Sequence, residues 1–246
     1  MRSYDHAMNH DLSLEHRESD LIEEMDRPDC DPVLLFNTYR QFQTLNRLIS
    51  RWPLIFDALI APIARRMNHK GRKLSVLDIG CGGGDVCLMM ARRAAMQELE
   101  ITVTGVDPDE RAITCARQLN SHHQVQFRHH HSEELVQRGD SYDVVISNHL
   151  LHHLQEPELQ NLCRNAEHLA EELILFNDIR RSRLGYRLFR SLAPLLFDTS
   201  YIVCDGLTSI RRSFTPGELA SLLPAEWQVR PLAPGRLMVI RELNQM

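Results

Sequence analysis

A short run of glycines between two aspartates is the feature of this sequence that most clearly indicates chemistry. Residues 80–84 contain four glycines, with Asp78 before them and Asp85 after them. Glycine tolerates positive φ and lets the backbone approach a ligand closely, so such a turn suits a nucleotide-like cofactor. A carboxylate at position 78 would repel a pyrophosphate, and the dinucleotide fingerprint requires glycine where Asp85 stands. The turn therefore favours a nucleoside that carries positive charge.

Regular elements on both sides of this turn would hold it in place. The mostly apolar residues 74–79 have the length of a strand, and an apolar residue recurs every fourth position from Val86 to Ala94, as on one face of a helix. Residues 101–107 are rich in β-branched side chains and predict a second strand. This strand ends in Asp107, whose carboxylate could accept both hydroxyls of a ribose. The alternative is an aspartate in a surface turn.

Strands and helices continue to alternate along the chain. Apolar runs predict strands at 124–128, 141–148 and 173–178, and helical patterns lie between them at 112–119 and 157–170. The last predicted elements are a helix with a capping box at 215–223 and a hairpin of strands at 227–233 and 236–241.

Three histidines, His149, His152 and His153, directly follow the fourth predicted strand. They would lie at the crevice where ligands bind in open α/β sheets. Because the ordinary pKa of histidine is close to neutral, any of them could act as a general base. The alternative is structural, with one of His152 and His153 facing the core and the other facing solvent.

In this order, the segments resemble the class I S-adenosylmethionine-dependent methyltransferases. Asp78, Gly80, Gly82 and Gly84 match the first motif, D/E-x-G-x-G-x-G, and residues 147–154 match the fourth-strand motif S-N-x-x-L-H-H-L. The resemblance covers about residues 70–246. The Asn-Pro-Pro-aromatic motif of enzymes that methylate exocyclic amines and amides is absent, which counts against those substrates.

The resemblance implies S-adenosyl-L-methionine as the cofactor and a set of residues that would bind it. Asn148 would support the methionine and sulfonium end. His131 and Ser132 fall where the family contacts adenine, although the family usually has an acid where His131 stands. The implied cofactor-binding residues are Asp78, Gly80, Cys81, Gly82, Asp107, Pro108, His131, Ser132 and Asn148.

The segments outside the motifs predict walls for a substrate pocket. Residues 1–12 are expected to be disordered and 13–31 to form a solvated helix and a turn. Helices from Val33 to Met67, broken at Pro53, would complete an N-terminal helical cover, 1–68, over the methyltransferase domain, 69–246. A helical insertion at about 180–213 follows the fifth strand. Substrate-pocket candidates are Tyr39, Phe42, Arg180, Tyr186 and Phe189, with ordinary helix packing as the alternative for the aromatic residues.

Composition excludes several classes of protein. The net charge of −5 over 246 residues gives no basic field for nucleic acid. The six cysteines show no metal-binding spacing, so we expect free thiols, no metal and a reducing compartment. Neither a signal peptide nor an apolar run of membrane-spanning length is evident. We therefore expect a cytoplasmic protein with a small-molecule substrate and no nucleic-acid or membrane partner. A homodimer is compatible with the sequence.

The sequence thus predicts an α/β protein with a doubly wound, mostly parallel seven-stranded sheet and helices on both faces. The favoured function is O-methylation of a phenolic or polyketide-like small molecule. C-methylation of a quinone-type ring is the first alternative. A non-catalytic protein that binds the cofactor and regulates a partner is the second, and an RNA methyltransferase is disfavoured by the acidic charge balance.

Overall fold

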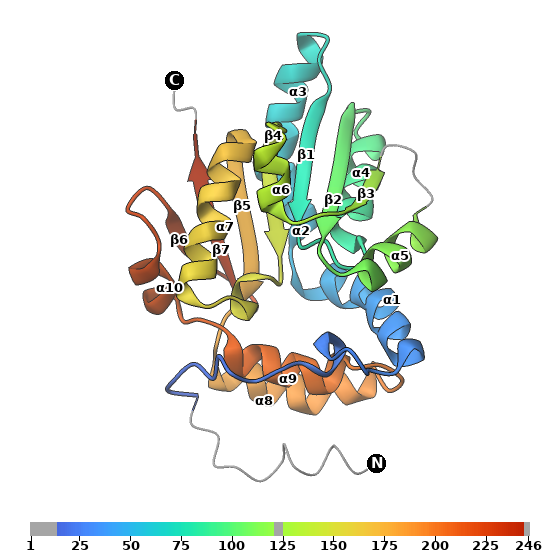
Figure 1. Cartoon of the computed structure of the whole chain (residues 1–246), viewed down its shortest axis with the longest axis vertical. Coiled ribbons are helices and arrows are strands. Elements are labelled where there is room, and N and C mark those ends of the chain that lie inside the picture. Colours follow the sequence, from blue (N-terminus) through green and yellow to red (C-terminus); the bar gives the residue numbers. More distant parts are fainter. Residues whose placement is uncertain (1–13, 121–124, 244–246) are drawn as a thin grey trace.

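A computed structural model describes residues 14–120 and 125–243. The segment 1–12 and Gln124, the first residue of the predicted third strand, lie outside the described residues. The rest forms a twisted sheet flanked by helices. Two further helices, α8 (Arg183–Leu192) and α9 (Ile202–Arg212), lie beyond the carboxyl ends of the central strands (Figure 1).

The sheet has seven strands in the order β3-β2-β1-β4-β5-β7-β6. Strands β1 to β5 run parallel, and β7 is antiparallel to both of its neighbours, β5 and β6. The predicted doubly wound, mostly parallel sheet is therefore confirmed. Strand order reverses between β1 and β4, which places a ligand crevice at their carboxyl ends. The strands are β1 Leu74–Ile79, β2 Ile101–Asp107, β3 Val125–His129, β4 Tyr142–Asn148, β5 Ala170–Ile179, β6 Gln228–Leu232 and β7 Arg236–Glu242.

Helices bury apolar side chains on both faces of the sheet. One core joins α2 to α5 with one face, and a second joins α6, α7 and α10 with the other. None of the helices in residues 14–120 and 125–243 is long and apolar enough to cross a membrane. The remaining helices are α1 Pro32–Ile49, α2 Trp52–Ile55, α3 Ala61–His69, α4 Asp85–Met96, α5 Glu110–Leu119, α6 Ser132–Gln137, α7 Glu156–Leu169 and α10 Pro216–Leu222, with a π-helical turn at Phe56–Ile60.

Most boundaries fall within three residues of their predicted positions. The break predicted at Pro53 lies earlier, because α1 ends at Ile49 and Arg51 adopts φ 61°. Pro53 instead occupies the first turn of α2, where its missing N–H is tolerated. The domain boundary at 68/69 stays a prediction, since α2 and α3 share a core with the sheet.

The solvated helix predicted for residues 13–31 is wrong for the described part of that segment. Residues 14–31 form an irregular strap across α9, with a single 3-10 turn at 24–26 (Figure 1). Asp205 of α9 accepts two backbone N–H groups of this turn at 2.8 and 3.0 Å. Arg211 pairs with Glu18 at 2.5 Å (Nη2–Oε2). These long-range partners satisfy the strap's polar groups without helical hydrogen bonds.

The glycine loop after β1 is tightly enclosed by side chains. Gly84 has φ +76°, and a Cβ atom there would lie 2.3 Å from Cζ of Phe127. A Cβ atom at Gly83 would lie 2.8 Å from Cβ of Tyr39. The loop therefore needs glycine for space as well as for backbone conformation.

Gly84→Ala should destabilise the fold more than Gly139→Ala. Both positions have positive φ, but a Cβ atom at Gly139 meets nothing within 4 Å. We expect about 1–2 kcal/mol of backbone strain in both variants and a further loss of about 1–3 kcal/mol from overpacking in Gly84→Ala. Urea denaturation measures the free energy of unfolding. Equal losses would contradict the packing of Phe127 against the loop.

Candidate functional site: a crevice between the glycine loop and helices α8 and α9

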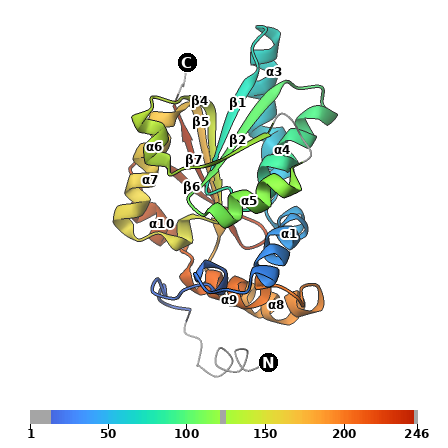
Figure 2. The same ribbon diagram turned by 45° about the vertical axis from the view of Figure 1, so that its right-hand side comes forward.

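A cavity of about 930 Å³ opens at the carboxyl ends of β1, β2 and β4. The glycine loop forms its inner end, and α1, α8, α9 and the strap contribute its other walls. Figure 2 shows α1 extending from the sheet toward the α8–α9 pair, which explains how segments far apart in sequence enclose one space. The cavity is at the upper end of the range for small-molecule sites.

Asp107 connects the end of β2 to the glycine loop. Its Oδ2 accepts the N–H of Gly82 at 2.9 Å, and its Oδ1 accepts the N–H of Asp109 at 2.8 Å. Burial raises the pKa of Asp107 despite these bonds. Asp107 and Pro108 both line the cavity, and contact of Asp107 with a ribose stays a prediction.

Asp78 is a buried acid beneath the same loop. Its Oδ2 lies 3.2 Å from the Cys87 thiol, and its Oδ1 has no hydrogen-bond partner among the described residues. Burial, together with nearby Asp85 and Asp107, raises its pKa to about 8. A buried acceptor without a partner is unfavourable, so a cationic donor at this loop would be stabilised.

Asn148, at the end of β4, is held rigidly from two sides. Its Oδ1 accepts the indole N–H of Trp52 at 3.0 Å and Nη2 of Arg236 at 2.9 Å. Arg236 is buried, and its Nε also donates to Oδ1 of Asn177 at 2.9 Å. Because the side-chain oxygen of Asn148 already accepts two hydrogen bonds, its NH2 group is the part available to the cavity.

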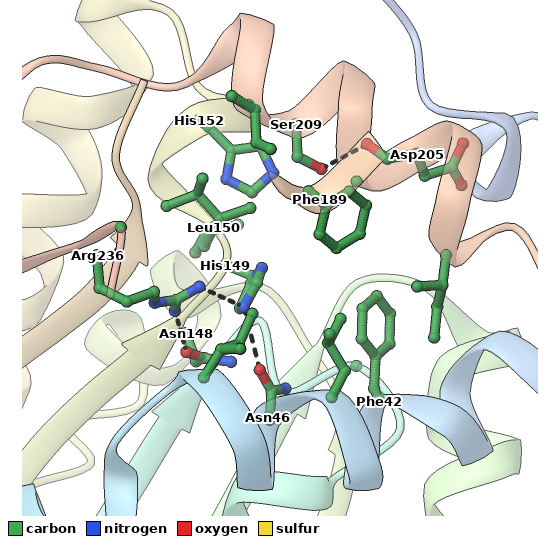
Figure 3. A pocket seen from close by; sticks show the side chains of 18 of the residues that line it. Phe42, Asn46, Asn148, His149, Leu150, His152, Phe189, Asp205, Ser209 and Arg236 are labelled. Atoms are coloured by element: carbon green, nitrogen blue, oxygen red, sulfur yellow. Dashed lines mark hydrogen bonds between the residues drawn. The ribbon is translucent and has the colours of Figure 1, made fainter. Parts of the chain in front are cut away.

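His149 is poorly suited to accept a proton. It adopts φ 60°, and its Nε2 lies 2.7 Å from Nη1 of Arg236 (Figure 3). The same Nε2 lies 3.1 Å from Oδ1 of Asn46, so it faces a guanidinium that can only donate and an amide oxygen that can only accept. Burial and the charge of Arg236 hold the pKa of His149 well below 6.5.

His152 is a buried histidine between two carboxylates. Its Nδ1 lies 2.7 Å from Oδ1 of Asp178, and its Nε2 lies 3.3 Å from Oε1 of Glu23 without the alignment of a hydrogen bond. Burial lowers the pKa of His152, but Asp178 and Glu23 outweigh it and raise the value to about 9. Burial opposes the ionisation of Glu23, yet His153 and His152 lower its pKa to about 2.

His153 completes a group with metal-ligand chemistry. Its Nε2 lies 3.8 Å from Oε1 of Glu23, and the ligand atoms of Glu23, His152 and His153 all lie within 4.8 Å of one another. The sequence showed no metal-binding spacing and gave no sign of this group, because Glu23 is over a hundred residues away in sequence. A histidine with a pKa near 9 carries a proton on both nitrogens at neutral pH, so the group is an ion-pair cluster in that state.

The cavity gathers most, but not all, of the residues singled out in the sequence. Tyr39, Phe42, Arg180 and Phe189 line it, together with the glycine loop and the three histidines. Tyr186 does not, and it packs instead with Leu14 and Ile210. His131 and Ser132 lie outside the lining, so their contact with adenine stays a prediction.

Several site residues were missed in the sequence because their roles depend on long-range packing. Asp178 could have been noticed as the acid at the end of the fifth strand. Trp52 and Arg236 gave no local signal, since each contacts Asn148 from a distant segment. Asn46, which donates to Asp85 at 2.9 Å, lies on the α1 face that covers the loop.

Comparison with known proteins identifies the domain that contains this crevice. Residues 76–172 match a family model described as a methyltransferase domain. The match covers less than half of the chain, and with the strand order it shows a methyltransferase domain of Rossmann-like fold at these residues.

The sequence relatives that match this chain carry methyltransferase names. The ubiquinone biosynthesis O-methyltransferase of Pseudomonas syringae pv. tomato is 38% identical over 129 residues, which cover 50% of this chain and 51% of that protein. The protein of the same name from Pseudomonas putida is 38% identical over 131 residues, with coverages of 51% and 52%. The chain thus spans about half the length of these curated relatives.

Two solved structures share the fold. The plantazolicin methyltransferase BamL, in complex with a triazolic desmethylPZN analog and SAH, aligns over 84% of this chain and 90% of that chain, with a TM-score of 0.59 and 17% identity. Human N-acetylserotonin methyltransferase in complex with SAM aligns over 84% and 55%, with a TM-score of 0.57 and 14% identity. At these identities the likeness establishes the fold alone.

The crevice suits S-adenosyl-L-methionine (SAM), the cofactor of this class. Four of the five loop residues, 80–84, are glycines, and Asp78 offers a buried oxygen without a partner among the described residues. Three acidic side chains, on Asp78, Asp85 and Asp107, line the cavity beside the loop. Burial raises the pKa of each, and a cationic nucleoside would favour their ionised forms, whereas an anionic dinucleotide would oppose them.

Asp107→Asn should weaken cofactor binding by roughly tenfold or more, because a charge-assisted hydrogen bond contributes about 1.5–3 kcal/mol. Isothermal titration calorimetry with S-adenosylhomocysteine (SAH) measures the change. Asp57→Asn, which removes the pairing with Arg93 away from the cavity, is the matched control. An unchanged dissociation constant for Asp107→Asn would show that Asp107 only shapes the loop.

Proposed function

We propose that this protein transfers a methyl group from SAM to a hydroxyl group of a small molecule. The observation that carries the proposal is the continuity of one cavity from the glycine loop to the His152–Asp178 pair. The cofactor crevice and a charged proton-transfer group are therefore open to the same space.

Bound SAM supplies an activated methyl group, so the chain mainly has to position the acceptor and exclude water. The glycine loop, Asp78 and Asp107 would hold the cofactor, and Asn148 would orient its methionine end. Phe42 and Phe189 line the same cavity as the histidines, with the Phe42 ring 6.1 Å from that of His149 between centroids, and would contact a flat acceptor ring (Figure 3).

His152 is the group best placed to receive the acceptor's proton. Asp178 holds Nδ1, so Nε2, which lies 3.3 Å from Oε1 of Glu23, would take the proton. Because the raised pKa keeps this ring protonated at neutral pH, it would accept the proton in its unprotonated form at higher pH. An anionic partner on Nδ1 stabilises the imidazolium that forms. His149 is the weaker candidate because Arg236 and Asn46 both lie against its Nε2 and its pKa is held well below 6.5.

A phenolic acceptor is favoured over the alternatives. The curated relatives are named ubiquinone biosynthesis O-methyltransferases, and aromatic and leucine side chains line the cavity here. Carbon methylation of a quinone-type ring is the second candidate, and the same proton acceptor would serve it. The homodimer, the cytoplasmic location and the absence of a nucleic-acid partner stay predictions.

Incubation of the protein with cell extract and isotopically methyl-labelled SAM tests the function. Mass spectrometry should find a labelled methyl ether of a small molecule. Label on a ring carbon would favour the second candidate. Binding of SAM without any labelled product would favour a non-catalytic, regulatory role.

His152 should also determine the pH dependence of turnover. Only the unprotonated ring can accept a proton, so the raised pKa predicts a rate that increases with pH and levels off above about 9. A histidine with its ordinary pKa would instead place this limb near neutral pH. Asp178→Asn removes the stabilising charge and should move the limb to lower pH.

His152→Gln should lower kcat by roughly 10²–10⁴ and abolish that limb, with SAH affinity unchanged. His168→Gln, on the exposed face of α7, is the control. Near-full turnover in His152→Gln, with the limb intact, would show that this histidine is structural.

A further inference from the structure

Helix α8 and the turn after it display a row of leucines to the outside of the molecule. Leu184, Leu188, Leu192, Leu195 and Leu196 recur at helical spacing, and each is more than half exposed. Isolated exposed leucines are ordinary, but a continuous apolar row on one face marks an interaction surface. We call these five residues the leucine row.

The opposite face of α8 is fixed to the protein, so the helix cannot rotate to bury this row. Tyr186, Ala193 and Phe197 are buried on that side. The ring of Phe189 packs against Gly206 of α9 so closely that a Cβ atom there would lie 2.4 Å from the ring. The leucine row therefore faces outward in the folded chain.

The row is accompanied by positive charge, although the whole chain is acidic. Residues 183–197 contain three arginines and no acid, whereas the chain carries −5. Arg183 pairs with Glu15. Arg187 and Arg190 are exposed, and no ion-pair partner is found for either within residues 14–120 and 125–243. Exposed apolar side chains beside unpaired arginines are typical of a helix that lies in the interfacial region of an anionic membrane.

The row also borders the mouth of the cavity. Four of its members, all except Leu195, line the cavity although they are more than half exposed, as does Leu48 of α1. Any surface that covers the leucine row would therefore face the entrance to the site.

We propose that α8 docks this protein on an anionic lipid surface. The leucine row would lie at the boundary between the lipid headgroups and the acyl chains, with Arg187 and Arg190 against lipid phosphates. The docking is peripheral, because no described helix can span a membrane. It would give the cavity direct access to an acceptor dissolved in the lipid. This departs from the expectation of no membrane partner and does not depend on the methyl-transfer proposal.

Co-sedimentation of the full chain with vesicles tests the proposal. The protein should bind vesicles of phosphatidylcholine with 30% phosphatidylglycerol, bind pure phosphatidylcholine much less, and lose binding as salt rises. Leu195→Glu should lower the partition coefficient by roughly tenfold or more. Leu195 is 78% exposed and does not line the cavity, so the folded state should tolerate the change.

Met96→Glu, at a residue 80% exposed at the end of α4, is the matched control and should bind as the wild type does. Arg187→Glu should weaken binding by roughly 25-fold, since each unit of charge contributes about fivefold, whereas Arg230→Glu should have no comparable effect. Circular dichroism and light scattering on each variant check that it is folded and determine its oligomeric state. Wild-type protein that ignores anionic vesicles, or Leu195→Glu that binds them normally, overturns the proposal. A wild-type dimer that Leu195→Glu converts to a folded monomer would assign the row to a second copy of the chain instead.

Discussion

The crevice depends on the hydrogen bond from the Gly82 N–H to the Asp107 carboxylate. This bond ties the loop after β1 to the end of β2, and the loop then lies in reach of Tyr39 on one side and Phe127 on the other. A Cβ atom at Gly83 or Gly84 would collide with these rings, so both positions require glycine. The same lack of side chains leaves the approach to Asp78 free for a cofactor. Packing and ligand binding thus both favour glycine in this loop.

The remaining structure balances buried charge around that crevice. Asp178 and Glu23 flank His152, and Arg236 lies among the polar ends of β4 and β5. Ionised groups are buried at acceptable free energy only when they are paired or hydrogen-bonded. The strap is needed for this balance because it brings Glu23 into the cavity, and Asp205 of α9 fixes its backbone. The N-terminal and insertion segments therefore complete the site as well as covering it.

Local patterns were sufficient to predict the sheet, its helices and the cofactor loop. Hydrophobic periodicity, glycine turns and helix caps are each determined by residues only a few positions apart. The capping box at Thr215 is one example, with the Glu218 carboxylate accepting the Thr215 N–H at 2.8 Å. The strap was predicted wrongly because its charged sequence satisfies its polar groups through α9 rather than through its own turns. Glu23 and Arg236 were missed for the same reason, since their partners are brought close only by the fold. The three adjacent candidate histidines looked alike in sequence, and only their neighbours, Arg236 and Asp178, separate their pKa values.

The central claim is that the glycine loop binds a cationic adenosyl cofactor and no dinucleotide. Calorimetric titration of the wild-type protein with SAH and with NAD, repeated for Gly82→Val, tests it most directly. Gly82 has φ +52°, so a branched side chain there is strained and enters the space of the cofactor. The account predicts saturable binding of SAH, none of NAD, and loss of SAH binding in a Gly82→Val variant that remains folded. Tight binding of NAD with no response to SAH would contradict it.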